Sequence, residues 1–129
     1  MKYFLMVMGF VFAIGAQAGQ ATVSLEGKAL DTEGYHSYNF GTVWTHSRSF
    51  VRFTVTNTGT TPLTYVDARI YGADFRASHS CVNGLLPNER CSFEVEYWPM
   101  FEGQSSGRFV LNFAEDDVVV DLWGQARRM

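Results

Sequence analysis

The chain has 129 residues, enough to fold as one domain around a single hydrophobic core. It carries 10 lysines and arginines against 13 aspartates and glutamates, so its net charge is −3, and both signs are scattered along the sequence. A chain that binds nucleic acid or an anionic membrane normally concentrates its basic residues in one stretch or on one face. We therefore expect neither kind of partner.

Segment 1–18 is typical of a secretory signal peptide. Lys2 precedes an uncharged apolar run over residues 3–14, and Ala16 and Ala18 supply the small side chains that signal peptidase requires. The run is shorter than the roughly 20 residues of a membrane-spanning helix, so no membrane span is expected in the mature chain. The sequence predicts cleavage between Ala18 and Gly19 and a periplasmic or secreted product.

Beyond the signal, short stretches in which apolar and polar residues alternate predict β-strands. Stretch 49–56 is the most regular, because Val51, Phe53 and Val55 alternate with polar residues. The polar segment 32–39 predicts a loop instead. In chain order, the expected strands cover residues 22–30, 49–56, 63–71, 75–77, 92–98, 108–114 and 118–124.

The pattern also predicts how some of these strands are arranged. Val66, Ala68 and Ile70 are expected on one inward face, with Leu63 out of phase as at a β-bulge. The last two strands should form a hairpin. Helices should be nearly absent, because no later stretch repeats its apolar residues every 3.6 positions. Seven or eight strands in about 100 residues predict an all-β sandwich.

Cys81 and Cys91 lie in a connection between two expected strands. An even number of cysteines in an exported protein favours a disulfide. A redox or metal-binding pair is the alternative. It is less favoured because nine residues separate the two cysteines, which is not the spacing of a CxxC motif.

Few residues suggest catalysis. His36, His46 and His79 are candidates for a metal ligand or general base, but each falls in or beside an expected loop, where a solvated histidine is the simpler interpretation. The run 115–117 is acidic but lacks the ligand spacing of a calcium loop, so a solvated turn is expected. The chain contains no GxSxG, HExxH or phosphate-binding glycine motif. We expect a non-enzymatic protein without a cofactor or metal.

The three tryptophans are candidates for surface binding, because exposed tryptophans are enriched at interface hot spots. In stretch 92–98, Phe93 and Tyr97 are expected to point inward, which places Trp98 outward with the glutamates at 94 and 96. Trp44 and Trp123 either are partly exposed or plug the ends of the sandwich. Exposed rings would serve a protein partner or, if all three lie on one open face, would stack on a carbohydrate.

The turn residues follow one another in a characteristic order. They are Phe40-Gly41-Thr42-Val43, Asn57-Thr58-Gly59, Pro62-Leu63, Gly72-Ala73-Asp74-Phe75, Leu86-Pro87, Tyr97-Trp98-Pro99 and Leu122-Trp123-Gly124. In this order, over residues 38–126, the chain is similar to the immunoglobulin-like family shared by ASH domains and bacterial choice-of-anchor D repeats. Asn88 departs from the pattern, because the family usually has glycine there, but asparagine tolerates the same backbone conformation.

The resemblance implies an immunoglobulin-like antiparallel β-sandwich of seven or eight strands over residues 38–129. Segment 19–37 would precede it and contribute a possible first strand. Members generally act as scaffold, targeting or protein-binding modules. For an exported domain, this implies a protein partner in a bacterial envelope assembly, periplasmic or at the surface. Fold analogy alone does not identify that partner, so the function depends on the surface residues.

Overall fold

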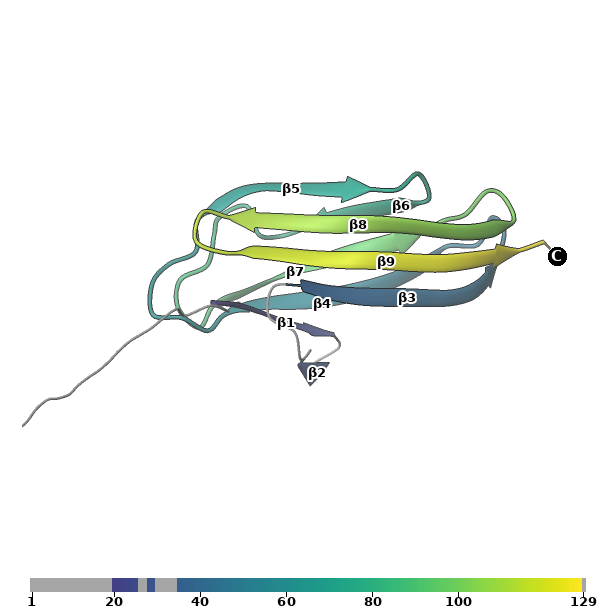
Figure 1. The fold of residues 1–129 in the computed structure, drawn as a ribbon. Coiled ribbons are helices and arrows are strands. Elements are labelled where there is room, and N and C mark those ends of the chain that lie inside the picture. Colours follow the sequence, from purple (N-terminus) through teal and green to yellow (C-terminus); the bar gives the residue numbers. More distant parts are fainter. Residues whose placement is uncertain (1–19, 26–27, 30–34, 129) are drawn as a thin grey trace, which may run out of the picture.

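The computed structural model describes residues 20–25, 28–29 and 35–128, which form two packed layers of β-sheet (Figure 1). The described residues contain no helix, and so none that could cross a membrane. The proposed signal peptide lies outside them. The strands are β1 (Ala21–Leu25), β2 (Lys28–Ala29), β3 (Tyr35–Trp44), β4 (Ser49–Asn57), β5 (Tyr65–Tyr71), β6 (Phe75–His79), β7 (Arg90–Tyr97), β8 (Gly103–Phe113) and β9 (Asp117–Arg127).

One layer has the strand order β2-β1-β4-β7-β6 and the other has the order β3-β9-β8-β5. Without the two-residue strand β2, each layer has four strands, so the predicted immunoglobulin-like sandwich is confirmed. One pairing differs from the expected antiparallel arrangement, because β3 runs parallel to β9. The chain passes from one layer to the other for β3 and then returns for β4, which allows this pairing.

The alternating pattern of the sequence determines which side chains form the core. On β4, the apolar residues predicted to point inward are buried, and Phe53 lies opposite Phe93 of β7. On the other layer, Phe109 of β8 lies opposite Val120 of β9, and both are buried. The two inner faces therefore meet over a continuous apolar layer, as period-two strands require.

Aromatic rings fill this layer in two groups. The Phe93 ring is stacked between Phe53 and Phe109, with ring centroids 4.8 and 4.4 Å away. Tyr97 stacks on Phe75, 5.0 Å away. Gly124 of β9 lies against the Tyr97 ring, where any Cβ would overlap the ring atoms. Burial raises the pKa of the Tyr97 hydroxyl.

The loop predicted over residues 32–39 is wrong where the structure describes it. From Tyr35 onward the chain belongs to β3, which pairs with β9. Tyr38 and Phe40 pack against the core, while Ser37 and Asn39 are exposed. The prediction failed because the side chains that point to solvent, Ser37 and Asn39, are polar. The segment is nevertheless a strand, because its backbone pairs with β9.

The inward face predicted for β5 is partly wrong. Ala68 and Ile70 pack against the core, but Val66 is exposed. The pairing with β8 shifts register between Tyr65 and Asp67, so the bulge lies there and not at Leu63. An extra residue at a bulge reverses the side-chain alternation before it. The predicted strand 22–30 is also shorter, since β1 ends at Leu25 and β2 pairs back onto it.

The acidic turn between β8 and β9 is more than a solvated turn. Glu115 accepts hydrogen bonds from the backbone N–H and hydroxyl of Thr64, at 2.7 and 3.0 Å. Asp116 accepts one from the backbone N–H of Ala21, at 2.9 Å. The Thr64 N–H lowers the pKa of Glu115 below its usual value. These carboxylates thus attach the hairpin to the start of β1 and to the segment before β5.

Candidate functional site

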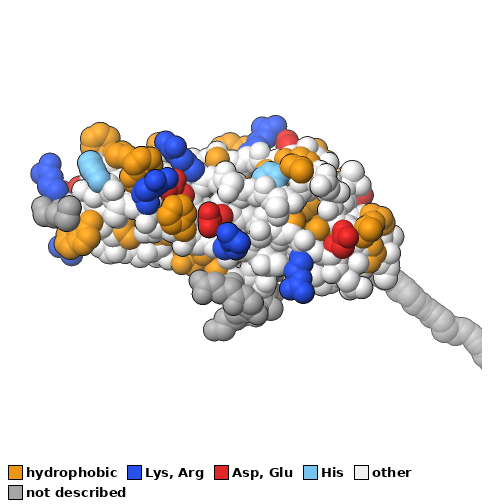
Figure 2. All heavy atoms as spheres, turned by 180° about the vertical axis from the view of Figure 1, so that it is seen from behind, with side chains coloured by type: hydrophobic (Ala, Val, Ile, Leu, Met, Phe, Trp, Pro, Cys, Tyr) orange, Lys and Arg blue, Asp and Glu red, His pale blue; other side chains and the backbone are white. Residues whose placement is uncertain are grey.

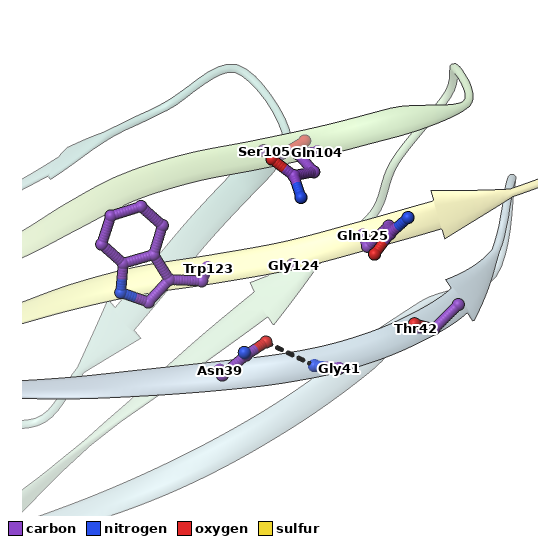
Figure 3. Close-up of a pocket in the computed structure, with 8 residues that line it drawn as sticks. All are labelled: Asn39, Gly41, Thr42, Gln104, Ser105, Trp123, Gly124 and Gln125. Atoms are coloured by element: carbon purple, nitrogen blue, oxygen red, sulfur yellow. Dashed lines mark hydrogen bonds between the residues drawn. The ribbon is translucent and has the colours of Figure 1, made fainter.

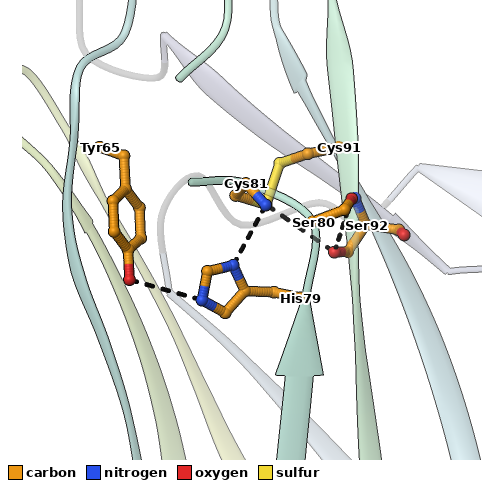
Figure 4. The surroundings of a disulfide bond; sticks show 6 residues. All are labelled: Tyr65, His79, Ser80, Cys81, Cys91 and Ser92. Carbon is orange, nitrogen blue, oxygen red and sulfur yellow. Dashed lines mark hydrogen bonds between the residues drawn. A yellow bond between two sulfur atoms is a disulfide. The ribbon is translucent and has the colours of Figure 1, made fainter. Parts of the chain in front are cut away.

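Cys81 and Cys91 form a disulfide with an S–S distance of 2.10 Å, which confirms the predicted bond (Figure 4). It closes the connection between β6 and β7, and both cysteines are buried. His79 accepts the backbone N–H of Cys81 on Nδ1, at 3.1 Å, and its Nε2 lies 3.4 Å from the Tyr65 hydroxyl. Because both sulfurs are buried and the neighbouring His79 is hydrogen-bonded, we interpret the disulfide as structural.

The histidines do not converge on one site. His46 is exposed in the turn after β3, at φ 67°. His36 lies on the buried side of β3, and His79 lies beside the disulfide. The prediction that they are solvated is therefore wrong for His36, whereas His79 is half-buried and hydrogen-bonded through both ring nitrogens. Within residues 20–25, 28–29 and 35–128, no cluster of three histidine, cysteine or acidic residues could hold a metal ion.

The buried His36 should make the fold sensitive to acid. Burial lowers its pKa below the ordinary value of 6.5, and its Nε2 has no hydrogen-bond partner among the described residues. As the pH falls through 6.5, His36 is protonated in the unfolded chain but stays neutral in the folded chain. The free energy of unfolding therefore decreases with falling pH until the lower pKa of the folded state is reached. Urea unfolding from neutral to mildly acidic pH measures this slope.

His36→Leu should flatten that slope relative to the wild-type chain. His46→Gln removes an exposed histidine and is the control. Equal slopes for His36→Leu and the wild-type chain would contradict this assignment.

The three tryptophans lie on two different faces. Trp44 is 54% exposed and Trp123 is 49% exposed, and both point outward from the layer that contains β9. Their cross-strand partners there are Arg127 and Asn39, respectively. Trp98 is half-buried at the end of β7, on the outer side of the other layer. The carbohydrate alternative required all three rings to share one open face, and this condition is not met.

Trp98 is the centre of a cluster that we call the arginine–aromatic patch, formed by Arg48, Phe50, Arg76, Trp98 and Phe101. The guanidinium carbons of Arg48 and Arg76 lie 4.7 and 5.4 Å from the Trp98 ring. Arg48 also contacts the Phe50 ring at 5.9 Å. Phe101, in the loop after β7, is 83% exposed. Figure 2 shows apolar and basic side chains gathered at one end of this face.

Two contacts position the patch. Glu96, predicted to point outward, is on the outer side of β7 but is buried because it forms an ion pair with Arg48. The backbone N–H of His46 donates to the carbonyl of Pro99 at 2.7 Å, which joins the turn after β3 to the loop that carries Phe101. The patch is therefore assembled from the turn before β4, from β4 and β6, and from the segment that follows β7. Sequence reasoning found only its Trp98.

A second feature lies on the opposite layer, beside Trp123. A hollow of about 240 Å³ is bordered by β3, β8 and β9 (Figure 3). Asn39 Oδ1 accepts the backbone N–H of Gly41 at 2.8 Å, where φ is +78°. The pairing of β3 with β9 shifts register there. Side chains that border the hollow include Asn39, Thr42, Gln104, Trp123 and Gln125.

Among these residues, the sequence predicted a binding role only for Trp123. The available signal was the alternation itself, which places Gln125 on the same side of β9 as Trp123, two positions further on.

Comparison with known families decides the relationship. Residues 34–125 match the HYDIN/CFA65/VesB-like model of Ig-like domains. The chain belongs to this family. The resemblance to ASH-type immunoglobulin-like domains is thus confirmed, and the match covers most of the sandwich. A comparison with curated proteins gives no match.

Solved structures with the same fold include modules of larger proteins. The secreted serine protease VesC from Vibrio cholerae is 18% identical, with a TM-score of 0.59 over 85% of this chain and 23% of VesC. The VesB protease of the same organism is 21% identical, with a TM-score of 0.57 over 83% of this chain and 31% of VesB. The ASH/PapD-like domain 7 of human CEP192 is 14% identical, with a TM-score of 0.58 over 99% of this chain and 96% of that domain.

These likenesses concern the fold alone, because every identity is low. The HYDIN/CFA65/VesB-like chain described here spans less than a third of either protease. By contrast, it corresponds to nearly the whole CEP192 domain. Family membership therefore points to a non-catalytic module.

Proposed function

We propose that the chain is an exported, non-enzymatic immunoglobulin-like module that binds another protein in a bacterial envelope assembly. The signal-like segment 1–18 supports export, and the family supports a non-catalytic role. The observation that carries the binding proposal is the arginine–aromatic patch. The carbohydrate-binding alternative loses its original basis, because the three tryptophans do not share a face.

The composition of the patch supports a protein partner. Tryptophan, phenylalanine and arginine are enriched at protein interfaces, and hot spots are drawn mainly from tryptophan, tyrosine and arginine. Phe101 projects 83% of its surface to solvent, and Phe50 projects 55%. Large apolar groups gathered at one end of a domain normally mark an interaction surface. The two arginines on Trp98 hold its ring in one orientation, so less side-chain freedom is lost on binding.

The patch also suggests the chemistry of the partner. Arg48 already pairs with Glu96, whereas Arg76 contacts only the Trp98 ring among the interactions described for its guanidinium. A carboxylate on the partner would complement Arg76, and an apolar pocket would receive Phe101. The partner should therefore present an acidic rim beside an apolar recess.

This proposal is tested by capture from envelope extracts. The full chain, with its own signal and a C-terminal tag, is recovered from the periplasm, where its N-terminus is expected at Gly19. Phe101→Ala and Arg76→Glu should each weaken the captured partner's affinity by at least about tenfold, as for a hot-spot residue. Binding of the purified partner, measured by biolayer interferometry, gives the affinities.

Val82→Ser serves as the matched control. Val82 is 59% exposed, like the patch residues, but lies beside the disulfide at the opposite end of β7. It should leave the affinity unchanged. A proteome-wide capture with no reproducible partner, or a partner that binds Phe101→Ala and wild-type chains equally, would count against the proposal.

A further inference from the structure

The hollow beside Trp123 has an unusual chemical character for a protein surface. None of the eight residues that border it is charged. Gln104 of β8 lies directly opposite Gln125 of β9, and Gln125 lies opposite Thr42 of β3. Three neighbouring strands thus place an amide, an amide and a hydroxyl in one row across the sheet. Trp123 and Asn39 form the next row.

The polar groups of the hollow are positioned for a ligand. Asn39 Oδ1 accepts a hydrogen bond from the Gly41 N–H, which holds the side chain in one orientation. The Asn39 side-chain NH₂ group is then available to donate to a ligand. The amides of Gln104 and Gln125 form no hydrogen bond with a described residue. Each amide offers both a donor and an acceptor. Such groups match hydroxyls, which also donate and accept.

Trp123 supplies the apolar part of the site. Its ring is half-exposed and lies among the polar side chains that border the hollow. Behind it, Gly124 rests against the buried Tyr97 ring, so the backbone of β9 is held firmly at this point. A rigidly mounted aromatic ring beside a few convergent polar groups is the usual composition of a small-ligand site.

The same ring also borders a second hollow, of about 380 Å³, on its other side. That hollow includes the half-exposed Tyr71 and the ion pair between Arg108 and Asp121, whose Nε and Oδ1 lie 2.6 Å apart. The two charges there neutralise each other. An extended ligand can therefore lie across Trp123, from one hollow to the other, and meet Arg108 and Asp121 only as an ion pair.

We propose that this face binds a neutral oligosaccharide, with one sugar ring stacked on Trp123 and its hydroxyls hydrogen-bonded to Asn39, Gln104 and Gln125. Sugars present an apolar face of C–H groups and a rim of hydroxyls, which is the combination this hollow complements. The site lies on the opposite layer from the arginine–aromatic patch. It is therefore independent of the proposed protein partner, and either proposal can fail alone.

Titration of the purified chain with neutral oligosaccharides of glucose and of N-acetylglucosamine tests this inference, with sulfated oligosaccharides as the charged comparison. Calorimetry and tryptophan fluorescence are the readouts. Trp123→Ala should lower the affinity at least about tenfold, and Gln125→Ala roughly two- to tenfold, the usual effect of one hydrogen bond. Binding should be insensitive to salt, because the ligand is uncharged.

Trp44→Ala is the matched control, because Trp44 is equally exposed on the same layer but lies outside this hollow. It should leave the affinity unchanged. Circular dichroism and thermal unfolding verify that each variant is folded. The proposal is overturned if no neutral oligosaccharide binds at millimolar concentration, if only sulfated ones bind, or if Trp123→Ala binds as well as the wild-type chain. Loss of a captured protein partner in Trp123→Ala would overturn it equally, by making this face a protein interface.

Discussion

Replacing Phe93 with alanine should cost the fold about 3–5 kcal/mol, the range for truncating a buried phenylalanine. The ring is 1% exposed and stacked between Phe53 and Phe109, which belong to different layers. Its removal therefore leaves a cavity at the contact between the two sheets. Neighbouring strands hold the surrounding rings in register, so the cavity cannot fully collapse. Urea unfolding followed by circular dichroism measures the loss.

Phe50→Ala is the matched control, because it removes the same side chain from an exposed position on β4, next to β7. Its effect should stay within about 0.5 kcal/mol. Phe93→Leu, which keeps most of the apolar volume, should fall between the two. If Phe93→Ala and Phe50→Ala were equally stable, the triple ring stack would not be the centre of the core.

The sequence was sufficient to predict the strands whose two sides differ strongly. In β4, β7 and the β8–β9 hairpin, apolar residues alternate with polar ones, and each predicted inward ring is buried. One buried face and one solvated face specify such a strand locally. The predicted disulfide followed from the expected export and the cysteine count, and the structure contains it.

Strand β3 could not be predicted in the same way. Its partner is β9, about 80 residues later in the chain, and the parallel pairing leaves no local turn signal. The outward side chains before Phe40 are polar, so the segment read as a loop. His36 was consequently placed in solvent, although it is buried on the inner side of this strand. Likewise, the bulge that exposes Val66 is visible only through the register with β8.

The two candidate surfaces depend on contacts of the same nonlocal kind. Counting positions along β7 placed Trp98 outward, but Arg48 reaches it from the turn before β4 and Arg76 reaches it from β6. The amides beside Trp123 come from three strands. Net charge was also a poor guide to local chemistry. A chain with scattered charges still gathers arginines at one end and leaves an uncharged hollow on the other layer.

Removing the disulfide should produce the second large loss of stability. The bond joins residues that are 10 apart, so it closes a loop of about 11 residues, and chain entropy alone predicts a loss of roughly 2.5–3 kcal/mol. The double variant Cys81→Ala/Cys91→Ala avoids stray thiols. Because the loop carries Leu85, which pairs with Leu63 and is buried, the loss should also loosen the start of β5.

Reduction of the wild-type chain provides the control for this prediction. In urea with excess dithiothreitol, the wild-type midpoint should fall to that of the double variant, whereas the double variant should be unaffected by the reductant. In the folded chain, the backbone N–H of Leu63 donates to the carbonyl of Leu85 at 2.8 Å, and the N–H of Leu85 donates to the carbonyl of Leu63 at 3.0 Å. Without the disulfide, both amides should show faster hydrogen–deuterium exchange. The prediction would be contradicted if amide exchange became faster only near the cysteines and the urea midpoint did not change. The hydrogen bonds and core contacts would then hold this connection in place without the disulfide. The expected result instead identifies the disulfide as the restraint that keeps the β6–β7 connection packed against Leu63, just before β5.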